Sequence, residues 1–229
     1  MLIEPGRGAR PFLESKLESG VPFAWLGPDQ IVFTLRDGAR FLLASASLEG
    51  RSVRRIQTVA WPTFFEMSAA GAPDGKSVFY AEGGFIYSVP ASGGTPERLC
   101  SGHSVAVDPA SRYLIIKHNA APENYLVRYS LSDRTEQRIE RSGKYRLTSA
   151  PLAPNAVGRD GRILVDVAPF DSWFWPAAII DPQTGETELA TDFQADMYSP
   201  GWDTEGRLVA SVMFFRSSIW RFRPDTNYR

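Results

Sequence analysis

Short apolar runs separated by turn residues follow one another along the whole chain. No window of 12 or more residues keeps the i, i+3, i+4, i+7 stripe of an amphipathic helix without a glycine or a proline. Five runs instead alternate or stay apolar over the length of one strand: QIVFTL (30–35), SVFYAE (77–82), YLIIKH (113–118), RILVDV (162–167) and RLVASVMF (207–214). This pattern predicts an all-β protein with half-buried or fully buried strands.

The five runs recur at a fairly regular interval. A turn signal precedes each run, and the equivalent turn residues are Asp29, Gly75, Ser111, Gly161 and Gly206. Their spacings are 46, 36, 50 and 45 residues. Self-similarity at a period of about 40–45 residues is typical of β-propellers, in which each repeat forms one four-stranded antiparallel blade.

Each repeat divides into four strands, here named a to d from the ring axis outward. Residues 72–99 display the order most clearly, because an ab turn, b strand, bc turn, c strand, cd turn and d strand follow with almost no spacer. Asp-Gly and Gly-Gly pairs supply the positive φ angles of such tight turns. The d strands carry charges, which oppose edge-to-edge pairing of blades from different molecules.

The last repeat ends before its d strand, and the N-terminus offers a replacement. Residues 2–15 have the pattern of the end of a c strand, a glycine turn and a d strand. We expect residues 9–15 to pair with residues 217–223 and to close a ring of five blades without a covalent link. One domain then covers residues 1–229, and a partial ring of six or seven blades is the alternative. The expected blade limits are about 20–58, 62–100, 103–141, 146–191 and 196–225, the last completed by 1–16.

The stretch APDGKSVFYAEGGFIYSVPASGGTPERL (72–99) resembles the bacterial WD40-like β-propeller repeat (PD40) of TolB-like propellers. The matching residues are Pro73, Asp74, Gly75, Lys76, Ile86, Tyr87, Gly93, Gly94 and Leu99. Ala72 stands where the family has serine, and the other four repeats keep only parts of the turn. The resemblance implies a ring, usually six-bladed in this family, that binds proteins or small ligands at one face without a cofactor. It also implies a place in a larger bacterial regulatory or envelope-associated protein.

Charge and reactive residues narrow the possible functions. The 25 basic and 26 acidic residues leave a net charge of −1, so we expect no nucleic-acid partner. The single Cys100 excludes an intrachain disulfide, and we expect a buried apolar thiol rather than a nucleophile paired with His103. His103 and His118 are too few for a dedicated zinc site, and no phosphate-loop, dinucleotide-binding or nucleophile-elbow motif occurs. We therefore expect no metal and no other cofactor.

The N-terminal residues do not form a secretory signal. The first sixteen residues lack a basic stretch followed by an apolar core, and no apolar run reaches the roughly 18 residues of a membrane-spanning helix. We expect no membrane insertion. The chain as written is expected in the cytoplasm, or in the periplasm if the natural protein begins before Met1.

Candidate binding residues gather where the propeller topology brings loops together. The bc and da connections lie at one face of the ring, and the ab and cd turns lie at the other. The most unusual bc connection, APFDSWFWP (168–176), places four aromatic rings around one carboxylate. These rings either pack on the neighbouring blade or form an exposed lip that anchors a partner. The candidate residues are Phe170, Asp171, Trp173 and Trp175, with Arg36, Trp61, His103, His118, Glu123, Asp196 and Tyr198 from other connections of this face.

Two functions fit this surface. The first is a non-catalytic domain that recognises a protein, a peptide or a small ligand, with carbohydrate also possible. The alternative is a glycosidase, which needs two carboxyl groups about 5–9.5 Å apart, one of them with a raised pKa. The candidate acids for that chemistry are Asp171, Asp196, Glu66 and Glu123.

Overall fold

The computed structural model describes residues 2–4, 8–10, 23–38, 40–49, 53–61, 67–170, 173–191 and 195–214. All the secondary-structure elements assigned in these ranges are β-strands, as the sequence predicted. Four sheets have four antiparallel strands each. The first two are β3 (Ala24–Leu26), β4 (Gln30–Asp37), β5 (Arg40–Ser47), β6 (Val53–Val59) and β7 (Ala69–Gly71), β8 (Ser77–Glu82), β9 (Phe85–Pro90), β10 (Glu97–Ser101).

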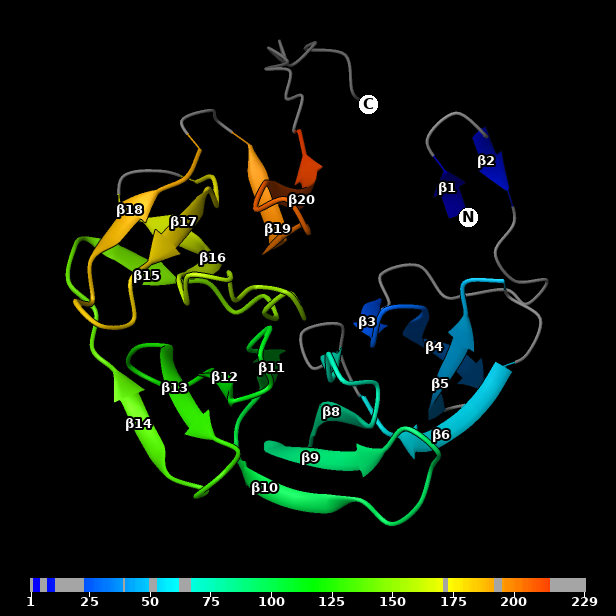
Figure 1. Cartoon of the computed structure of the whole chain (residues 1–229). Helices are drawn as coiled ribbons and strands as arrows, with labels where there is room; N and C mark the ends of the chain where they lie inside the picture. The colour runs from blue at the N-terminus through cyan, green and yellow to red at the C-terminus, as the bar shows by residue number, and fades with distance from the viewer. Residues whose placement is uncertain are drawn as a thin grey trace, which may run out of the picture.

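The chain continues with two more four-stranded sheets and a pair of strands. They are β11 (Ser104–Val107), β12 (Tyr113–His118), β13 (Tyr125–Ser130), β14 (Glu136–Ile139); β15 (Tyr145–Leu147), β16 (Ile163–Pro169), β17 (Ala177–Ile180), β18 (Thr187–Leu189); and β19 (Asp196–Trp202), β20 (Leu208–Met213). In Figure 1 the sheets stand side by side around a ring, with β3, β11 and β19 near the centre and β6, β10, β14 and β18 at the rim. The predicted a-to-d order from axis to rim is clear in the β3–β6 and β11–β14 sheets, and the protein is a β-propeller.

A separate hairpin lies near the N-terminus. β1 (Leu2–Glu4) pairs with β2 (Gly8–Arg10), which agrees with the predicted strand, glycine turn and strand. In Figure 1 this hairpin lies in the opening of the ring, between the β3–β6 sheet and the β19–β20 pair. Most of the expected closing pair, residues 9–15 with residues 217–223, lies outside the described residues. The five-bladed closure therefore stays a prediction.

Adjacent sheets bury both faces of the b strands β8, β12 and β16. Val78 and Tyr80 of β8 belong to the apolar cluster shared with the β3–β6 sheet. Phe79 and Ala81 of the same strand belong to the cluster shared with the β11–β14 sheet. Since alternate residues point to opposite faces of a strand, a strand buried on both sides is apolar at most positions. This is why the b strands appear in the sequence as continuous apolar runs.

The inner strands are joined directly from one blade to the next. The backbone N–H of Gly27 donates to the Ala72 carbonyl (3.1 Å), and the N–H of Val107 donates to the Pro154 carbonyl (3.2 Å). Hydroxyl groups make equivalent joints, since Ser68 Oγ accepts from Val105 N (2.9 Å) and Ser104 Oγ accepts from Leu152 N (3.1 Å). These bonds satisfy polar backbone groups that are buried where the blades converge.

The fourth blade departs from the regular pattern at its inner strand. β15 pairs with the last residues of β16, and a single bridge joins Val157 to Ile163 further along. The intervening segment contains Pro151 and Pro154, which cannot donate to a ladder and so interrupt the strand. Its carbonyl groups bond to neighbouring blades instead, with Pro151 O accepting from Ser199 Oγ at 3.0 Å.

Gly71 lies where the inner strands of two neighbouring blades are in close contact. A Cβ atom at this position would overlap the carbonyl oxygen of Trp25 and lie 2.9 Å from Leu26 Cα, both of the neighbouring blade. We predict that Gly71→Ala lowers the free energy of unfolding by about 2–3 kcal/mol, because backbone atoms must move apart. The measurement is urea denaturation followed by tryptophan fluorescence.

Gly83→Ala is the matched control for that substitution. Gly83 has a φ of 59° and open space around it, so its variant carries only the cost of the left-handed backbone, about 1 kcal/mol. Equal losses for the two variants would contradict close contact between β3 and β7.

Candidate functional site

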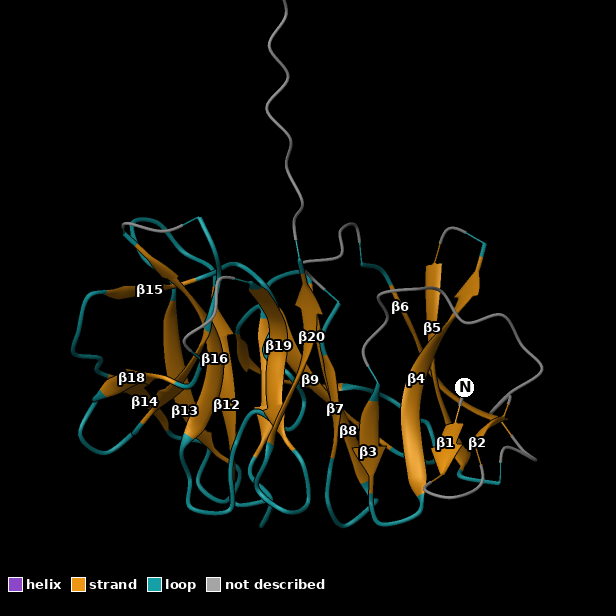
Figure 2. Cartoon of the chain, turned by 90° about the horizontal axis from the view of Figure 1, so that it is seen from above, coloured by secondary structure: helices purple, strands orange, loops and turns teal. Residues whose placement is uncertain are grey.

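The bc and da connections meet at the face that lies at the top of Figure 2, here called the bc/da face. Hydrogen bonds tie connections of neighbouring blades to each other there. Gly102 N donates to Gly84 O (2.9 Å), and Ala60 N donates to Glu82 Oε1 (2.6 Å). The loops of this face are therefore held by the propeller frame and by one another.

The fourth blade meets the fifth through Trp175. Its backbone N–H donates to Asp196 Oδ1 (2.8 Å), and its carbonyl accepts from Met197 N (2.8 Å). The Trp175 ring lies 5.8 Å from the Tyr198 ring. Burial, followed by the charges of Asp196 and Asp166, raises the pKa of Tyr198. The structure thus brings three predicted site residues together, and the buried Asp196 serves there as a backbone acceptor.

Two aromatic side chains of the same bc connection point into solvent. Trp173 is 96% exposed and Phe170 is 66% exposed. The Arg146 guanidinium lies over the Phe170 ring at 4.1 Å. The structure therefore divides the predicted aromatic group, because Trp175 packs on the next blade whereas Phe170 and Trp173 form an exposed lip. Asp171 lies outside the described residues.

The two histidines lie together at the end of the third blade. The His118 ring stacks on Tyr125 with centroids 4.5 Å apart and meets the His103 ring edge-on at 6.2 Å. His103 Nδ1 accepts from Asn119 N (3.2 Å). Burial, then the nearby His103 and Arg138, lowers the pKa of His118. Because its neutral form is favoured and the ring is buried, His118 has the properties of a packing residue.

The remaining candidates occupy different environments. Glu123 forms an ion pair with Arg141, and Arg141 also donates to the Tyr145 carbonyl (3.1 Å). Trp61 is buried in the core between the first two blades, where its Nε1 donates to Ala81 O (2.5 Å). A partner cannot reach this side chain in the folded state. Arg36 is exposed at the bc turn of the first blade and donates to Gly38 O (3.2 Å).

Sequence reasoning missed two buried ionisable residues, Lys117 and Asp166. Each is the fifth residue of its run, YLIIKH (113–118) or RILVDV (162–167), and interrupts the apolar stretch there, which is the signal that could have identified them. Lys117 Nζ donates to Ala150 O (2.5 Å) in the next blade, and the Thr148 hydroxyl donates to the Asp166 carboxyl group. Burial lowers the pKa of Lys117 and raises that of Asp166, while each charge partly offsets the shift of the other. Both residues are 1% exposed, so neither is positioned to contact a substrate. The Lys117 bond joins the third and fourth blades, and the Asp166 bond lies within the fourth.

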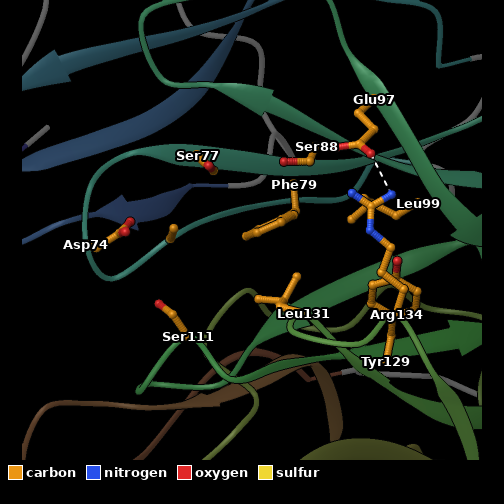
Figure 3. Close-up of a pocket in the computed structure, with 11 residues that line it drawn as sticks. Asp74, Ser77, Phe79, Ser88, Glu97, Leu99, Ser111, Tyr129, Leu131 and Arg134 are labelled. Atoms are coloured by element: carbon orange, nitrogen blue, oxygen red, sulfur yellow. Dashed lines mark ion pairs between the residues drawn. The ribbon is translucent and has the colours of Figure 1, made fainter.

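A cavity lies between the second and third blades, toward the ab and cd turns. Figure 3 shows its lining, and its volume is about 250 Å³. Glu97 and Arg134 form an ion pair across it (2.7 Å), and Tyr129 and Phe79 supply apolar surface. Since the two charges neutralise each other, the cavity presents no unpaired charge from this pair to a ligand.

Cys100 packs in the apolar cluster between the second and third blades. Burial, with a smaller effect of the Glu136 charge, raises the pKa of its thiol to about 12. The expected apolar role fits this environment. Among the described residues, no three His, Cys, Asp or Glu side chains form a group that could hold a metal ion, and no described helix is long and apolar enough to span a membrane.

Asp166 and Asp108 provide a paired test of how burial and ion pairing shift pKa values. Asp166 has a raised pKa in the folded state, so its contribution to stability is lost as pH rises above about 4. Burial alone would raise the pKa of Asp108, but the hydrogen bonds and the positive charge of Arg112 lower it below its usual value. The stability that Asp108 contributes is therefore lost as pH falls.

We predict opposite pH trends for Asp166→Asn and Asp108→Asn. We expect the unfolding free energy of the parent minus that of Asp166→Asn to decrease as pH rises from 4 to 8. The unfolding free energy of the parent minus that of Asp108→Asn should instead increase as pH rises from 2 to 5. Urea denaturation at a series of pH values measures both differences. Trends of the same sign would contradict the assigned environments.

Cys100 should be unreactive in the native protein. A pKa near 12 leaves on the order of a thousandfold less thiolate at pH 8 than an ordinary thiol has. We predict that a colorimetric disulfide reagent modifies the thiol at least about a hundredfold more slowly in native protein than in protein unfolded by urea. Stoichiometric modification of the native protein within seconds would show an accessible, activated thiol.

Comparison with known proteins places the fold. No protein-family profile matches the chain, and no curated protein matches its sequence. The structure is similar to a protein assigned as TolB from Agrobacterium tumefaciens, with a TM-score of 0.65 and 16% identity over 84% of this chain and 69% of that chain. TolB from Acinetobacter baumannii gives a TM-score of 0.61 and 19% identity over 81% of this chain.

The chain spans 46% of the length of the Acinetobacter protein. A structure of a nidogen–laminin complex also contains a similar chain, with a TM-score of 0.64 and 14% identity over 84% of this chain and 71% of that chain. Identities this low establish the fold and nothing more. The chain is a β-propeller whose fold resembles those of TolB and the nidogen propeller.

Proposed function

We propose that this propeller is a non-catalytic domain that binds a protein or peptide at its bc/da face. The observation that carries the proposal is the exposed lip of Phe170 and Trp173 on that face. Large aromatic side chains in water expose apolar area that a partner can bury, and tryptophan is among the residues that most often dominate binding energy. Phe170 directly follows β16, and the backbone of Trp175, two residues after Trp173, is hydrogen-bonded to the next blade, which limits the backbone freedom that binding must remove.

The environments of the described carboxylates support binding over glycoside hydrolysis. Asp196 is buried and accepts the Trp175 N–H, and Glu123 is paired with Arg141. Asp166 has the raised pKa of a general acid, but it is 1% exposed in the interior. Glycosidases need two carboxyl groups that reach the same sugar. Two of the four candidate acids are thus engaged in structural contacts, and Glu66 and Asp171 lie outside the described residues.

We also infer that residues 72–99 form a PD40-type repeat within a larger bacterial regulatory or envelope-associated protein. Its family-like turn residues adopt the conformations that the motif requires. Gly75, Gly93 and Gly94 have φ angles of 75°, 85° and 141°, and Asp74 Oδ1 accepts from Lys76 N (3.0 Å). These features explain why the motif needs glycine and aspartate at these positions.

Trp173→Ala tests the proposal directly. Peptides selected from a displayed random library against the immobilised chain should bind the parent and lose at least about tenfold in affinity for this variant. Trp25→Ala is the matched control, since Trp25 is 55% exposed near the ab turn of the first blade. Equal affinities for parent and Trp173→Ala would contradict the proposal. Hydrolysis of an oligosaccharide that is lost in Asp196→Asn would favour the glycosidase instead.

A further inference from the structure

We propose that the partner segment bound at the bc/da face is an acidic peptide with an aromatic or large aliphatic anchor. It would dock on the basic–aromatic patch, defined as Lys144, Tyr145, Arg146, Phe170 and Trp173 of the fourth blade. This inference rests on the proposed function and specifies its partner. Asp171 and Ser172 lie outside the described residues and are not part of the patch.

The sheet register explains why cations and rings alternate in the patch. Tyr145 lies opposite Pro169 and Arg146 opposite Ala168 in the β15–β16 pair. Phe170 is therefore the diagonal neighbour of Arg146 on the same face, and the two side chains meet at 4.1 Å. Lys144 Nζ lies over the Tyr145 ring at 5.9 Å. The ring of Phe170 thus holds a guanidinium group at the edge of an exposed apolar surface.

No described carboxylate forms an ion pair with Lys144 or Arg146. Within the described part of the chain, neither Lys144 nor Arg146 has an ion pair or a side-chain hydrogen bond. Two acids at the end of the third blade are engaged elsewhere, Glu123 with Arg141 and Glu140 with Arg138 at 4.0 Å. A partner carboxylate could therefore pair with either cation without displacing an existing contact.

Charge and shape favour an acidic peptide over other ligands. The chain has a net charge of −1, and two unpaired cations are too few for the backbone of a nucleic acid. A neutral sugar could stack on the Trp173 ring, but it would leave the charges of Lys144 and Arg146 without a partner. Trp173, three residues after Phe170 in the same connection, is 96% exposed and can pack against an apolar anchor. Carboxylates around an apolar anchor complement both features of the patch.

The test uses peptide selection with a charge-reversed variant. A displayed random peptide library is selected on the parent chain and, in parallel, on Lys144→Glu/Arg146→Glu. We expect the parent to enrich peptides with net negative charge and at least one aromatic or large aliphatic residue. These peptides should lose at least about tenfold in affinity for the variant, and the variant should instead enrich basic peptides.

Arg54→Glu/Arg55→Glu is the control. It makes the same change in net charge on exposed residues of β6, in the first blade. It should keep the parent's peptide preference, and both variants should give the parent's circular dichroism spectrum and unfolding midpoint. If the Arg54/Arg55 variant changes the preference as much as the Lys144/Arg146 variant, overall charge decides binding and the patch does not.

The outcomes separate this inference from the proposed function. Peptides that depend on Trp173 but have no bias toward negative charge would overturn the acidic partner and leave the binding face intact. Acidic peptides that bind equally well to Trp173→Ala would overturn the role of the lip. Failure to enrich any peptide that depends on Trp173 would overturn both proposals.

Discussion

Convergence of the inner strands at the ring axis is the constraint on which the rest of the structure depends. Radial sheets approach each other most closely there, so side chains must be small and backbone groups must find partners in the next blade. Gly71 meets the first constraint, since even a methyl group would overlap the backbone of β3. Ser68 and Ser104 meet the second, because each hydroxyl accepts a backbone N–H from the following blade. The inner joints thus fix the order and spacing of the blades.

Farther from the axis, the frame buries polar side chains that strengthen the same joints. Lys117 and Asp166 occupy equivalent positions in successive b strands, yet each bonds differently. Lys117 crosses to the next blade through Ala150, whereas Asp166 is held by Thr148 of its own inner segment. Buried ionisable groups are costly unless they are hydrogen-bonded, so a proline-interrupted inner segment that exposes its carbonyls is useful here. In a regular strand these backbone carbonyl groups would be hydrogen-bonded within the sheet. In the irregular inner segment of the fourth blade they can accept hydrogen bonds from neighbouring blades.

The turn residues and the apolar runs between them made most of the fold predictable from the sequence. Turn residues such as Gly75 and Gly161 have positive φ angles, and the apolar runs after them became the doubly buried b strands. Side-chain environments were harder to predict because they depend on contacts between blades. Trp61 was expected at the face, but its indole donates to a carbonyl of the next blade. Glu123 is separated from its partner, Arg141, by two strands and a turn. No single-sequence pattern indicates such pairings.

The difference between connections explains why recognition is assigned to one side of the ring. The bc turn of the second blade is a glycine pair, Gly83–Gly84, and leaves little side-chain surface. The connection of the fourth blade is longer, and only part of its aromatic content is needed for packing. Trp175 fills the gap to β19, and its backbone is held by Asp196 and Met197. Trp173, two residues earlier, is held next to an anchored neighbour yet lies in water. Tryptophan has only two side-chain torsions to order on binding, and its large apolar area can be buried by a partner, which makes this connection the strongest candidate for contact with a partner.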